Sequence, residues 1–345
     1  MGKTVGFGVI GCGVIAPWHT QSLLSVPEAR LVAVCDVVPE KADRLAADSG
    51  GVKAYYDHNH LLADPEVDAV CVCVPSGLHS AVGVDACKAG KHVLSEKPID
   101  VTLEHIDALV AAAAVSKVNL GCIFQRRTQK LWQTVRQTIQ SGKIGKLLLA
   151  DAYLKYYRSQ EYYDCAGWRG TWELDGGGAL MNQGVHCVDL MRWICGDPVS
   201  VFARCGHFAR NIEVEDTAVA VVTYASGAVG VIEGTTSVYK GMEHRLEFHG
   251  ETGNILIEGA RIVRWETNNG SEPPDDLYTV RGEASANPVD IGLDNHTAQI
   301  QDFARSILDG RAPLVTGEEA RGSVELILGI YQSDQTGSVV HFPLT

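Results

Sequence analysis

The residues with the clearest chemical potential lie in a glycine-rich segment, Gly176–Leu190. If this segment is helical, Asn182, His186 and Asp189 are spaced by four and three residues and share one face. A histidine that shares its face with two polar groups is a candidate general base. The alternative is a structural histidine, which is the commoner role of a lone histidine on a helix.

A second candidate site lies near the N-terminus, where six residues match the pattern GxGxxA: Gly11, Cys12, Gly13, Val14, Ile15 and Ala16. The pattern predicts a dinucleotide-binding turn, because Gly11 permits a tight turn and Gly13 leaves room for a pyrophosphate. Ala16 allows close packing of the following helix, whose N-terminus offers N–H groups to phosphates. A glycine-rich turn without a ligand is the alternative.

An acidic residue, Asp36, follows the second predicted strand. A carboxylate there can bind both hydroxyls of a ribose and repel a 2′-phosphate, and Val37-Val38-Pro39 supplies no arginine to offset that repulsion. The sequence therefore predicts NAD as the cofactor, with NADP less favoured. A solvated carboxylate at a strand end is the alternative.

A third motif, Glu96-Lys97-Pro98, follows the short predicted strand His92–Leu94. Ligands of doubly wound sheets bind at the carboxyl ends of the strands, which is where this motif lies. An exposed ion pair before a proline turn is the alternative.

Aromatic residues are concentrated in Tyr156–Trp172, which holds four Tyr and two Trp of the chain's 24 aromatic side chains. Rings interleaved with Arg158, Glu161 and Arg169 suit a carbohydrate, because its C–H faces stack on rings while its hydroxyls bind polar groups. The segment is thus a candidate lid or substrate wall. A hydrophobic cluster under a long loop is the alternative.

The elements that must position these motifs fall into two groups. In residues 1–123, short apolar runs alternate with helical stretches, which predicts a parallel, doubly wound Rossmann sheet. The strands are expected at Val5–Ile10, Leu31–Cys35, Ala69–Val74, His92–Leu94 and Asn119–Phe124, and the helices at Ala16–Ser25, Pro39–Asp48, His79–Ala89 and Leu103–Ser116.

Residues 124–345 predict an α+β domain with a large, mainly antiparallel open sheet, because several strand patterns follow one another with glycine-containing turns. A single helix is expected over Gly178–Ile194. Both alternating faces of the strand Thr217–Tyr224 are largely apolar. The sheet therefore needs a cover on each side, and we expect helices on one and another subunit on the other.

Composition narrows the classes of function. A length of 345 residues suits two cores, and a net charge of −13 argues against nucleic acid and anionic membranes as partners. No leader peptide or membrane-spanning run is recognised. None of the ten cysteines forms a C-x-x-C pair, so we expect no metal and a cytoplasmic protein with buried, reduced thiols.

Taken together, the segments resemble the glucose–fructose oxidoreductase / inositol dehydrogenase / rhizopine-catabolism (Gfo/Idh/MocA) family. The resemblance rests on GCGVIA with His19 shortly after it, VPSGLH (Val74–His79), AGKHVLSEKP (Ala89–Pro98) and GGGALMNQGVHCVDL (Gly176–Leu190), and it covers nearly the whole chain in order. It implies an NAD(P)-dependent oxidoreductase for sugars, cyclitols or their derivatives, working as a homodimer or homotetramer through the C-terminal sheet.

The resemblance also implies roles for residues. Lys97 would be the catalytic lysine and His186 the acid/base. Asn182 stands where the sugar-oxidising members usually have Asp, and because an amide does not titrate it is expected to bind a substrate hydroxyl. The expected cofactor-binding residues are Gly11, Cys12, Gly13, Val14, Ile15, Ala16, Asp36, Val74, Pro75, Ser76, His79, Glu96, Lys97, Gln125, Trp168 and Arg169. The expected substrate-binding residues are Lys97, Gln125, Arg126, Arg158, Tyr163, Trp168, Asn182 and His186.

The sequence thus predicts an NAD-dependent dehydrogenase that takes hydride from a secondary hydroxyl of a sugar or glycoside, with oxidation at C3 favoured. A UDP-sugar 3-dehydrogenase or an inositol dehydrogenase is the alternative within the class. A non-catalytic, NAD-sensing regulator on the same fold is the alternative from another class, and the presence of both Lys97 and His186 argues against it.

Overall fold

The computed structural model describes residues 3–277 and 293–344, which divide into two compact units. Unit 1 comprises Met1–Gln125 and Gly292–Arg321, and unit 2 comprises Arg126–Ile291 and Gly322–Thr345. The sequence placed the whole of residues 124–345 in the second domain, so the position of Gly292–Arg321 differs from that expectation.

Unit 1 is built on a six-stranded parallel sheet in the order β3-β2-β1-β4-β5-β6. All six residues of the central strand β1 are buried, because helices cover both faces of such a sheet. This confirms the predicted Rossmann fold. The strands are β1 Val5–Ile10, β2 Ala29–Cys35, β3 Lys53–Tyr55, β4 Ala69–Val72, β5 His92–Ser95 and β6 Leu120–Cys122. The helices are α1 Ala16–Ser25, α2 Pro39–Asp48, α3 His58–Leu62, η1 Ser76–Leu78, α4 His79–Lys88, α5 Leu103–Ser116 and α9 Leu293–Asp309.

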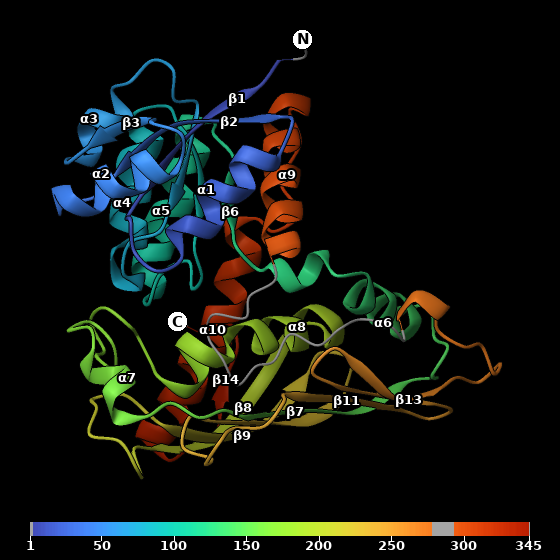
Figure 1. Cartoon of the computed structure of the whole chain (residues 1–345). Helices are drawn as coiled ribbons and strands as arrows, with labels where there is room; N and C mark the ends of the chain where they lie inside the picture. Colours follow the sequence, from blue (N-terminus) through green and yellow to red (C-terminus); the bar gives the residue numbers. More distant parts are fainter. Residues whose placement is uncertain (1–2, 278–292, 345) are drawn as a thin grey trace. The chain divides into compact units, whose positions relative to one another are not determined.

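Helix α9 belongs to unit 1 because its apolar face completes the core of the Rossmann sheet. Ile300, Phe303 and Ala304 are buried in the same cluster as Phe7 of β1, whose ring centroid lies 6.4 Å from that of Phe303. Figure 1 shows α9 running beside α1. The domain boundary therefore could not be read as one point in the chain, because a distant segment returns to the first core.

Unit 2 is built on an eight-stranded sheet in the order β13-β12-β11-β7-β10-β9-β8-β14. Strands β7 and β10 pair in parallel and every other neighbouring pair is antiparallel, which confirms the predicted mainly antiparallel sheet. The strands are β7 Leu147–Lys155, β8 Pro198–Gly206, β9 Thr217–Tyr224, β10 Val229–Thr235, β11 Arg245–Gly250, β12 Asn254–Glu258, β13 Arg261–Glu266 and β14 Val340–His341. The helical elements are η2 Gln125–Thr128, α6 Lys130–Gln140, α7 Gln160–Asp164, η3 Ala179–Gly184, α8 Val185–Cys195, η4 Asp275–Leu277 and α10 Gly317–Thr336, of which η2 and α10 begin in unit 1.

The two faces of the unit 2 sheet differ in exposure. Helices α6 and α8 cover one face (Figure 1), and there Ala218, Ala220 and Val222 of β9 are at most 1% exposed. On the other face Val219 and Val221 are 44% and 52% exposed. These exposed apolar residues are the ones for which we expected another subunit to cover the sheet.

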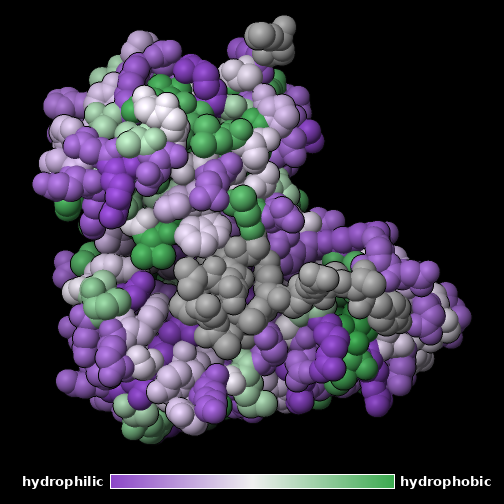
Figure 2. All heavy atoms as spheres, in the orientation of Figure 1, coloured by the Kyte–Doolittle hydropathy of each residue, from purple (hydrophilic) through white to green (hydrophobic). Residues whose placement is uncertain are grey.

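The exposed side chains and the state of the cysteines are as the composition predicted. Polar and charged side chains dominate the face of each unit seen in Figure 2. All ten cysteines are free thiols, and eight of them are buried. Among the described residues, we find no helix whose length and hydropathy would allow it to cross a membrane.

Candidate active site

The glycine-rich turn of unit 1 lies between the end of β1 and the start of α1. Gly11 has a φ of +95°, and a Cβ on it would lie 2.5 Å from the carbonyl oxygen of Cys73, so only glycine is accommodated. Gly13 is exposed, and a Cβ on it would meet no atom within 4 Å. The protein's own packing therefore does not require glycine here, and the room that Gly13 leaves fits the pyrophosphate of a dinucleotide.

The Asp36 carboxylate closes this turn at the end of β2. Its Oδ2 accepts the Cys12 N–H at 2.8 Å, and its Oδ1 accepts the Val38 N–H at 2.9 Å. The side chain remains half-buried, as a ribose-binding carboxylate requires. Burial raises the pKa of the Cys12 thiol to about 12, so this cysteine stays protonated and is not a nucleophile at neutral pH.

The predicted cofactor-contacting segment surrounds η1. Val74 and Pro75 are half-buried, whereas Ser76 and His79 are buried. The ring of His79 places Nδ1 at 2.7 Å from the carbonyl oxygen of Pro98 and Nε2 at 2.9 Å from that of Val74. Both ring nitrogens thus bind the protein, and His79 ties this segment to the residue that follows Lys97.

The Glu96-Lys97 pair follows β5. Glu96 is buried and Lys97 is half-buried. The Lys97 backbone N–H donates to Glu96 Oε2 at 3.1 Å. Gln125, which was expected to reach the cofactor and the substrate, is also buried in this unit.

The glycine-rich segment of unit 2 differs from the single helix that the sequence predicted. Residues 179–184 form the π-helical turn η3, and the α-helix α8 begins at Val185. Gly178 is required because a Cβ there would lie 2.1 Å from the carbonyl oxygen of Glu215. A π-turn is wider than an α-turn, so Asn182 in η3 does not continue the α-helical spacing that relates His186 and Asp189 in α8.

The three polar residues consequently have different surroundings. His186 and Asn182 are half-buried, and the Asn182 amide donates to Asp175 Oδ1. Asp189 is 1% exposed and pairs with Arg127 through an Nη2–Oδ1 distance of 2.6 Å. Asp189 therefore anchors helix α8 in the core and is not available to a substrate.

A hydrogen-bonded chain links Asn182 to the aromatic segment. Gln183 donates to Asn182 Oδ1 at 2.7 Å and to the Tyr162 hydroxyl at 2.9 Å. Its own Oε1 accepts from Arg158 Nη2 at 2.8 Å. Arg158, which was expected to bind substrate, is 6% exposed, so its contact with Gln183 orients the residues around Asn182.

The aromatic segment itself gathers rings and guanidinium groups. Arg169 lies over the Tyr162 ring at 4.2 Å and over the Trp168 ring at 5.4 Å, and both Arg169 and Trp168 are half-buried. Tyr163 is buried, with its hydroxyl 2.9 Å from that of Thr236. A half-buried cation between rings suits an anionic or hydroxyl-rich ligand.

The expected substrate residue Arg126 contacts its own unit. Its Nη1 lies 2.9 Å from His244 Nε2 and 3.1 Å from Cys187 Sγ. Burial and the Arg126 charge hold the pKa of His244 well below its usual range, so the imidazole is a neutral acceptor. Since Cys187 follows His186 directly, Arg126 helps to fix the start of α8.

Glu215, which sequence reasoning missed, is buried beneath the glycine-rich segment. Its carboxylate accepts the N–H groups of Gly178 and Leu180 at 3.0 and 2.9 Å and the Tyr331 hydroxyl at 2.8 Å. Burial raises the pKa of Glu215 to about 7, although the bonds from Leu180 and Gly178 oppose that rise. No local signal could have found it, because its partners lie 35 or more residues away.

The Glu215→Gln variant is expected to flatten the pH dependence of stability. A carboxyl whose pKa rises from 4.5 to about 7 on folding contributes stability below pH 4.5 that is lost as the pH rises through 7, amounting to about 3 kcal/mol. Urea unfolding of the full chain between pH 5 and 8 measures this, with the exposed Glu213→Gln as control. Equal slopes in wild type and Glu215→Gln would contradict the assignment.

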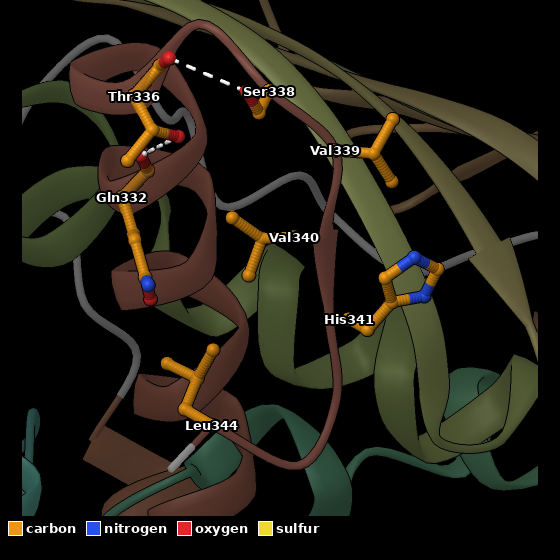
Figure 3. A pocket seen from close by; sticks show the side chains of 7 residues that line it. All are labelled: Gln332, Thr336, Ser338, Val339, Val340, His341 and Leu344. Atoms are coloured by element: carbon orange, nitrogen blue, oxygen red, sulfur yellow. Dashed lines mark hydrogen bonds between the residues drawn. The ribbon is translucent and has the colours of Figure 1, made fainter.

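Among the described residues, two hollows of unit 2 are relevant to the site. One of about 390 Å³ lies beside the end of α10 and β14 (Figure 3). It contains none of the predicted site residues, and His341 is the one titratable side chain in its lining of Gln332, Thr336, Ser338, Val339, Val340, His341 and Leu344. The other, beside Arg126 and His244, measures about 10 Å³ and has no room for a ligand larger than water.

The chain is similar in sequence to known oxidoreductases. Residues 5–124 match the sequence model of the oxidoreductase family with an NAD-binding Rossmann fold, GFO_IDH_MocA, and residues 132–256 match that of the GFO/IDH/MocA C-terminal domain. The myo-inositol 2-dehydrogenase of Thermotoga maritima is 28% identical over 337 residues, covering 93% of each chain. The scyllo-inositol 2-dehydrogenase (NAD(+)) of Bacillus subtilis is 25% identical, covering 99% of this chain and 97% of its own.

A solved structure is similar over the same length. The WlbA dehydrogenase of Bordetella pertussis, in complex with NADH and UDP-GlcNAcA, superposes with a TM-score of 0.89 and 32% identity. The match covers 99% of this chain and all of the other.

Proposed function

The chain belongs to the Gfo/Idh/MocA family of NAD-binding oxidoreductases, and from this premise we propose that it oxidises a secondary hydroxyl of a sugar ring with NAD, preferentially at C3. The observation that carries the proposal is the dinucleotide turn, in which Gly13 presents bare backbone beside the half-buried Asp36. Half-buried Lys97 and His186 supply the polar groups that the chemistry needs.

NAD, when bound, accepts a hydride at C4 of its nicotinamide. The chain's own residues would hold it through the Gly11–Ala16 turn and Asp36. His186 takes the proton of the substrate hydroxyl as the C–H bond yields its electron pair, so the carbinol becomes a ketone. Lys97 donates to the same oxygen and stabilises its developing negative charge. Asn182 binds a neighbouring hydroxyl, oriented by its contacts with Asp175 and Gln183.

Among sugars, we propose a UDP-linked hexose derivative as the first substrate to test. The WlbA structure, which holds UDP-GlcNAcA, matches at 32% identity, against 28% and 25% for the two inositol dehydrogenases. In a chain with a net charge of −13, half-buried Arg169 lies against Tyr162, and half-buried Arg210 lies against Tyr157. Such a gathering of guanidinium groups favours an anionic ligand. The sequence alone favoured a free sugar or glycoside.

The test is the formation of NADH from NAD with UDP-GlcNAcA, UDP-GlcNAc, glucose, methyl glucoside and myo-inositol, followed at 340 nm. Turnover with any of these supports a dehydrogenase, and NMR of the product locates the ketone at C3 or elsewhere. Tight NAD binding without turnover of any member of the panel would instead support the regulator.

Asp36 is expected to set the preference for NAD. Asp36→Ser combined with Val37→Arg removes the charge that repels a 2′-phosphate and adds a cation for it. We expect kcat/KM for NAD to fall by at least about tenfold, because a charged hydrogen bond of about 1.5–3 kcal/mol is lost, while that for NADP rises. Steady-state kinetics with both cofactors measures the change, and the exposed Asp48→Ser is the control. An unchanged preference would refute the assignment.

We also propose that the outer face of the unit 2 sheet pairs two copies of the chain. Phe202, Val219, Val221 and Val229 are 43–52% exposed on neighbouring strands of that sheet, and burying them would exclude apolar surface from water. Sedimentation equilibrium tests this assembly. The ten free thiols support a reducing compartment such as the cytoplasm.

A further inference from the structure

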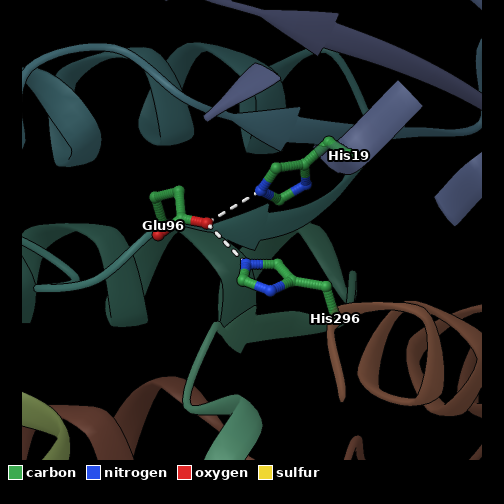
Figure 4. Close-up of side chains that lie close together, drawn as sticks. All are labelled: His19, Glu96 and His296. Atoms are coloured by element: carbon green, nitrogen blue, oxygen red, sulfur yellow. Dashed lines mark hydrogen bonds and ion pairs between the residues drawn. The ribbon is translucent and has the colours of Figure 1, made fainter. Parts of the chain in front are cut away.

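Three buried side chains of unit 1 meet on one carboxylate oxygen (Figure 4). His19 Nε2 lies 2.8 Å from Glu96 Oε1, and His296 Nε2 lies 3.5 Å from the same atom. The two rings stand edge to face with centroids 5.7 Å apart. His19, Glu96 and His296 are 0%, 6% and 1% exposed, so this cluster is closed off from bulk water.

The cluster brings together three distant parts of the chain. His19 comes from α1, Glu96 follows β5, and His296 comes from α9. Helix α9 reaches this position because its other buried residues pack into the Rossmann core, and Thr297 Oγ1 also donates to Ser22 Oγ of α1 at 3.0 Å. The packing of α9 thus delivers His296 to Glu96 as a fixed side chain.

The two imidazoles keep Glu96 ionised. Burial alone would raise the pKa of the Glu96 carboxyl, but the hydrogen bonds from His19 and His296 hold it well below its usual range. The Nδ1 atom of each ring has no hydrogen-bond partner among the described residues, which fits rings that carry their proton on Nε2 and donate it to the carboxylate.

The other carboxylate oxygen connects this cluster to the proposed site. Glu96 Oε2 accepts the backbone N–H of Lys97 at 3.1 Å. A carboxylate held on one oxygen by two rigid rings presents its second oxygen in a fixed direction. The peptide group at the base of the Lys97 side chain is therefore anchored, which is how a reacting ammonium is kept within tenths of an ångström of its target.

We propose that His19 and His296 are positioning residues that clamp Glu96 and, through it, fix the backbone from which Lys97 reaches the reacting oxygen. This inference rests on the proposed function, in which Lys97 acts on the substrate. Helix α9, which comes late in the chain, thereby contributes a residue to the same unit that carries the cofactor turn near the N-terminus.

Other titratable groups also face Glu96 in unit 1. The thiols of Cys71 and Cys73 are buried, and burial together with the charge of Glu96 raises their pKa values, so they stay neutral. Burial lowers the pKa of His79, although the charge of Glu96 opposes this shift. The Cys122 thiol donates to the backbone oxygen of Glu96 at 3.7 Å. None of these thiols, nor His79, is hydrogen-bonded to the Glu96 carboxylate among the described contacts, whereas His19 and His296 are.

The variants His296→Leu and His296→Gln test the clamp. Leucine removes the donor, whereas the glutamine amide can still donate to Glu96. We expect kcat to fall about 10- to 100-fold in His296→Leu, because small misplacements of a reacting group are costly, and to recover at least partly in His296→Gln.

Loss of a donor should raise the pKa of Glu96, so activity should decline at a higher pH in His296→Leu than in wild type as the solution is acidified. The exposed His60→Leu is the matched control.

A second measurement does not depend on turnover. In the full chain labelled with ¹³C at the glutamate carboxyl, the resonance that disappears in Glu96→Gln reports Glu96. We expect it to titrate at higher pH in His296→Leu than in wild type. This result stands even if no sugar is oxidised, so failure of the proposed function is distinguishable from failure of the clamp. An unchanged Glu96 titration would overturn the inference, as would one equivalent of tightly held zinc in the purified protein, which would make the same three side chains metal ligands.

Discussion

Replacing Lys97 with methionine is expected to lower kcat for sugar oxidation by about 10²- to 10⁴-fold while leaving the affinity for NAD within a few-fold of wild type. Methionine preserves the length of the side chain but removes the charge that stabilises the developing alkoxide. His186→Asn is expected to cost a similar factor, because the amide cannot accept the hydroxyl proton at neutral pH. These losses fall on kcat, since both interactions strengthen as the hydroxyl ionises.

The measurement combines steady-state rates at saturating NAD with NAD binding followed by fluorescence. Exposed Lys88→Met and His207→Asn are the matched controls, because they remove the same functional groups from the surfaces of unit 1 and unit 2. Near-wild-type turnover in Lys97→Met or His186→Asn would refute the mechanism. Loss of NAD binding together with turnover would show instead that the variant had lost its folded cofactor domain.

Breaking the buried ion pair of unit 2 is expected to produce the largest loss of stability. Arg127 and Asp189 are each 1% exposed, and they share two hydrogen bonds, with an Nε–Oδ2 distance of 2.8 Å and an Nη2–Oδ1 distance of 2.6 Å. Ser323 adds a third donor to the same carboxylate at 2.8 Å. Removing either charged partner leaves the other charge buried without compensation, at a cost of about 3–5 kcal/mol.

Urea unfolding of Asp189→Asn, Arg127→Met and the double variant measures this cost. The double variant should lose less than the sum of the two single losses, because it leaves no isolated charge in the core. Asp107→Asn is the control, since its pair with Arg321 is partly exposed and should contribute about 0–1 kcal/mol. Additive losses in the double variant would contradict a direct coupling. Activity should fall as well, because Asp189 lies on the same helix as His186.

Much of the architecture was predictable because it depends on local rules. The bounds of β9 agree with the predicted Thr217–Tyr224, since a short run of β-branched and apolar residues beside a glycine-containing turn is a local signal of a strand. The turn from Gly11 to Ala16 was equally predictable, because the tight turn within one strand–turn–helix unit requires glycine at fixed positions. The cofactor class and the parallel sheet both follow from such short-range patterns.

The details around the proposed catalytic helix were not predictable in this way. Residues 179–184 have a composition compatible with an α-helix, and their π-helical turn is stabilised by contacts with Glu215, more than thirty residues away in sequence. The same turn separates Asn182 from Asp189, which ends in the core against Arg127. Periodicity predicted a single helix over Gly178–Ile194 with Asp189 beside Asn182 and His186. It could not place Asp189 in the core, because that position depends on Arg127, a partner that periodicity does not include.

The length of the chain predicted two domains, and residue types at short spacing predicted the dinucleotide turn with Asp36 and the candidate base His186. The role of Lys97 was predicted from the resemblance to the Gfo/Idh/MocA family. The packing of whole elements places α9 in the first unit, brings His296 to Glu96 and sets Glu215 beneath the glycine-rich segment. These contacts join residues 35 to 296 positions apart, and such pairings are set by how whole elements pack. Burial of apolar surface stabilises these contacts, and buried polar groups need partners to offset the cost of losing water. Both effects arise only once the chain has folded.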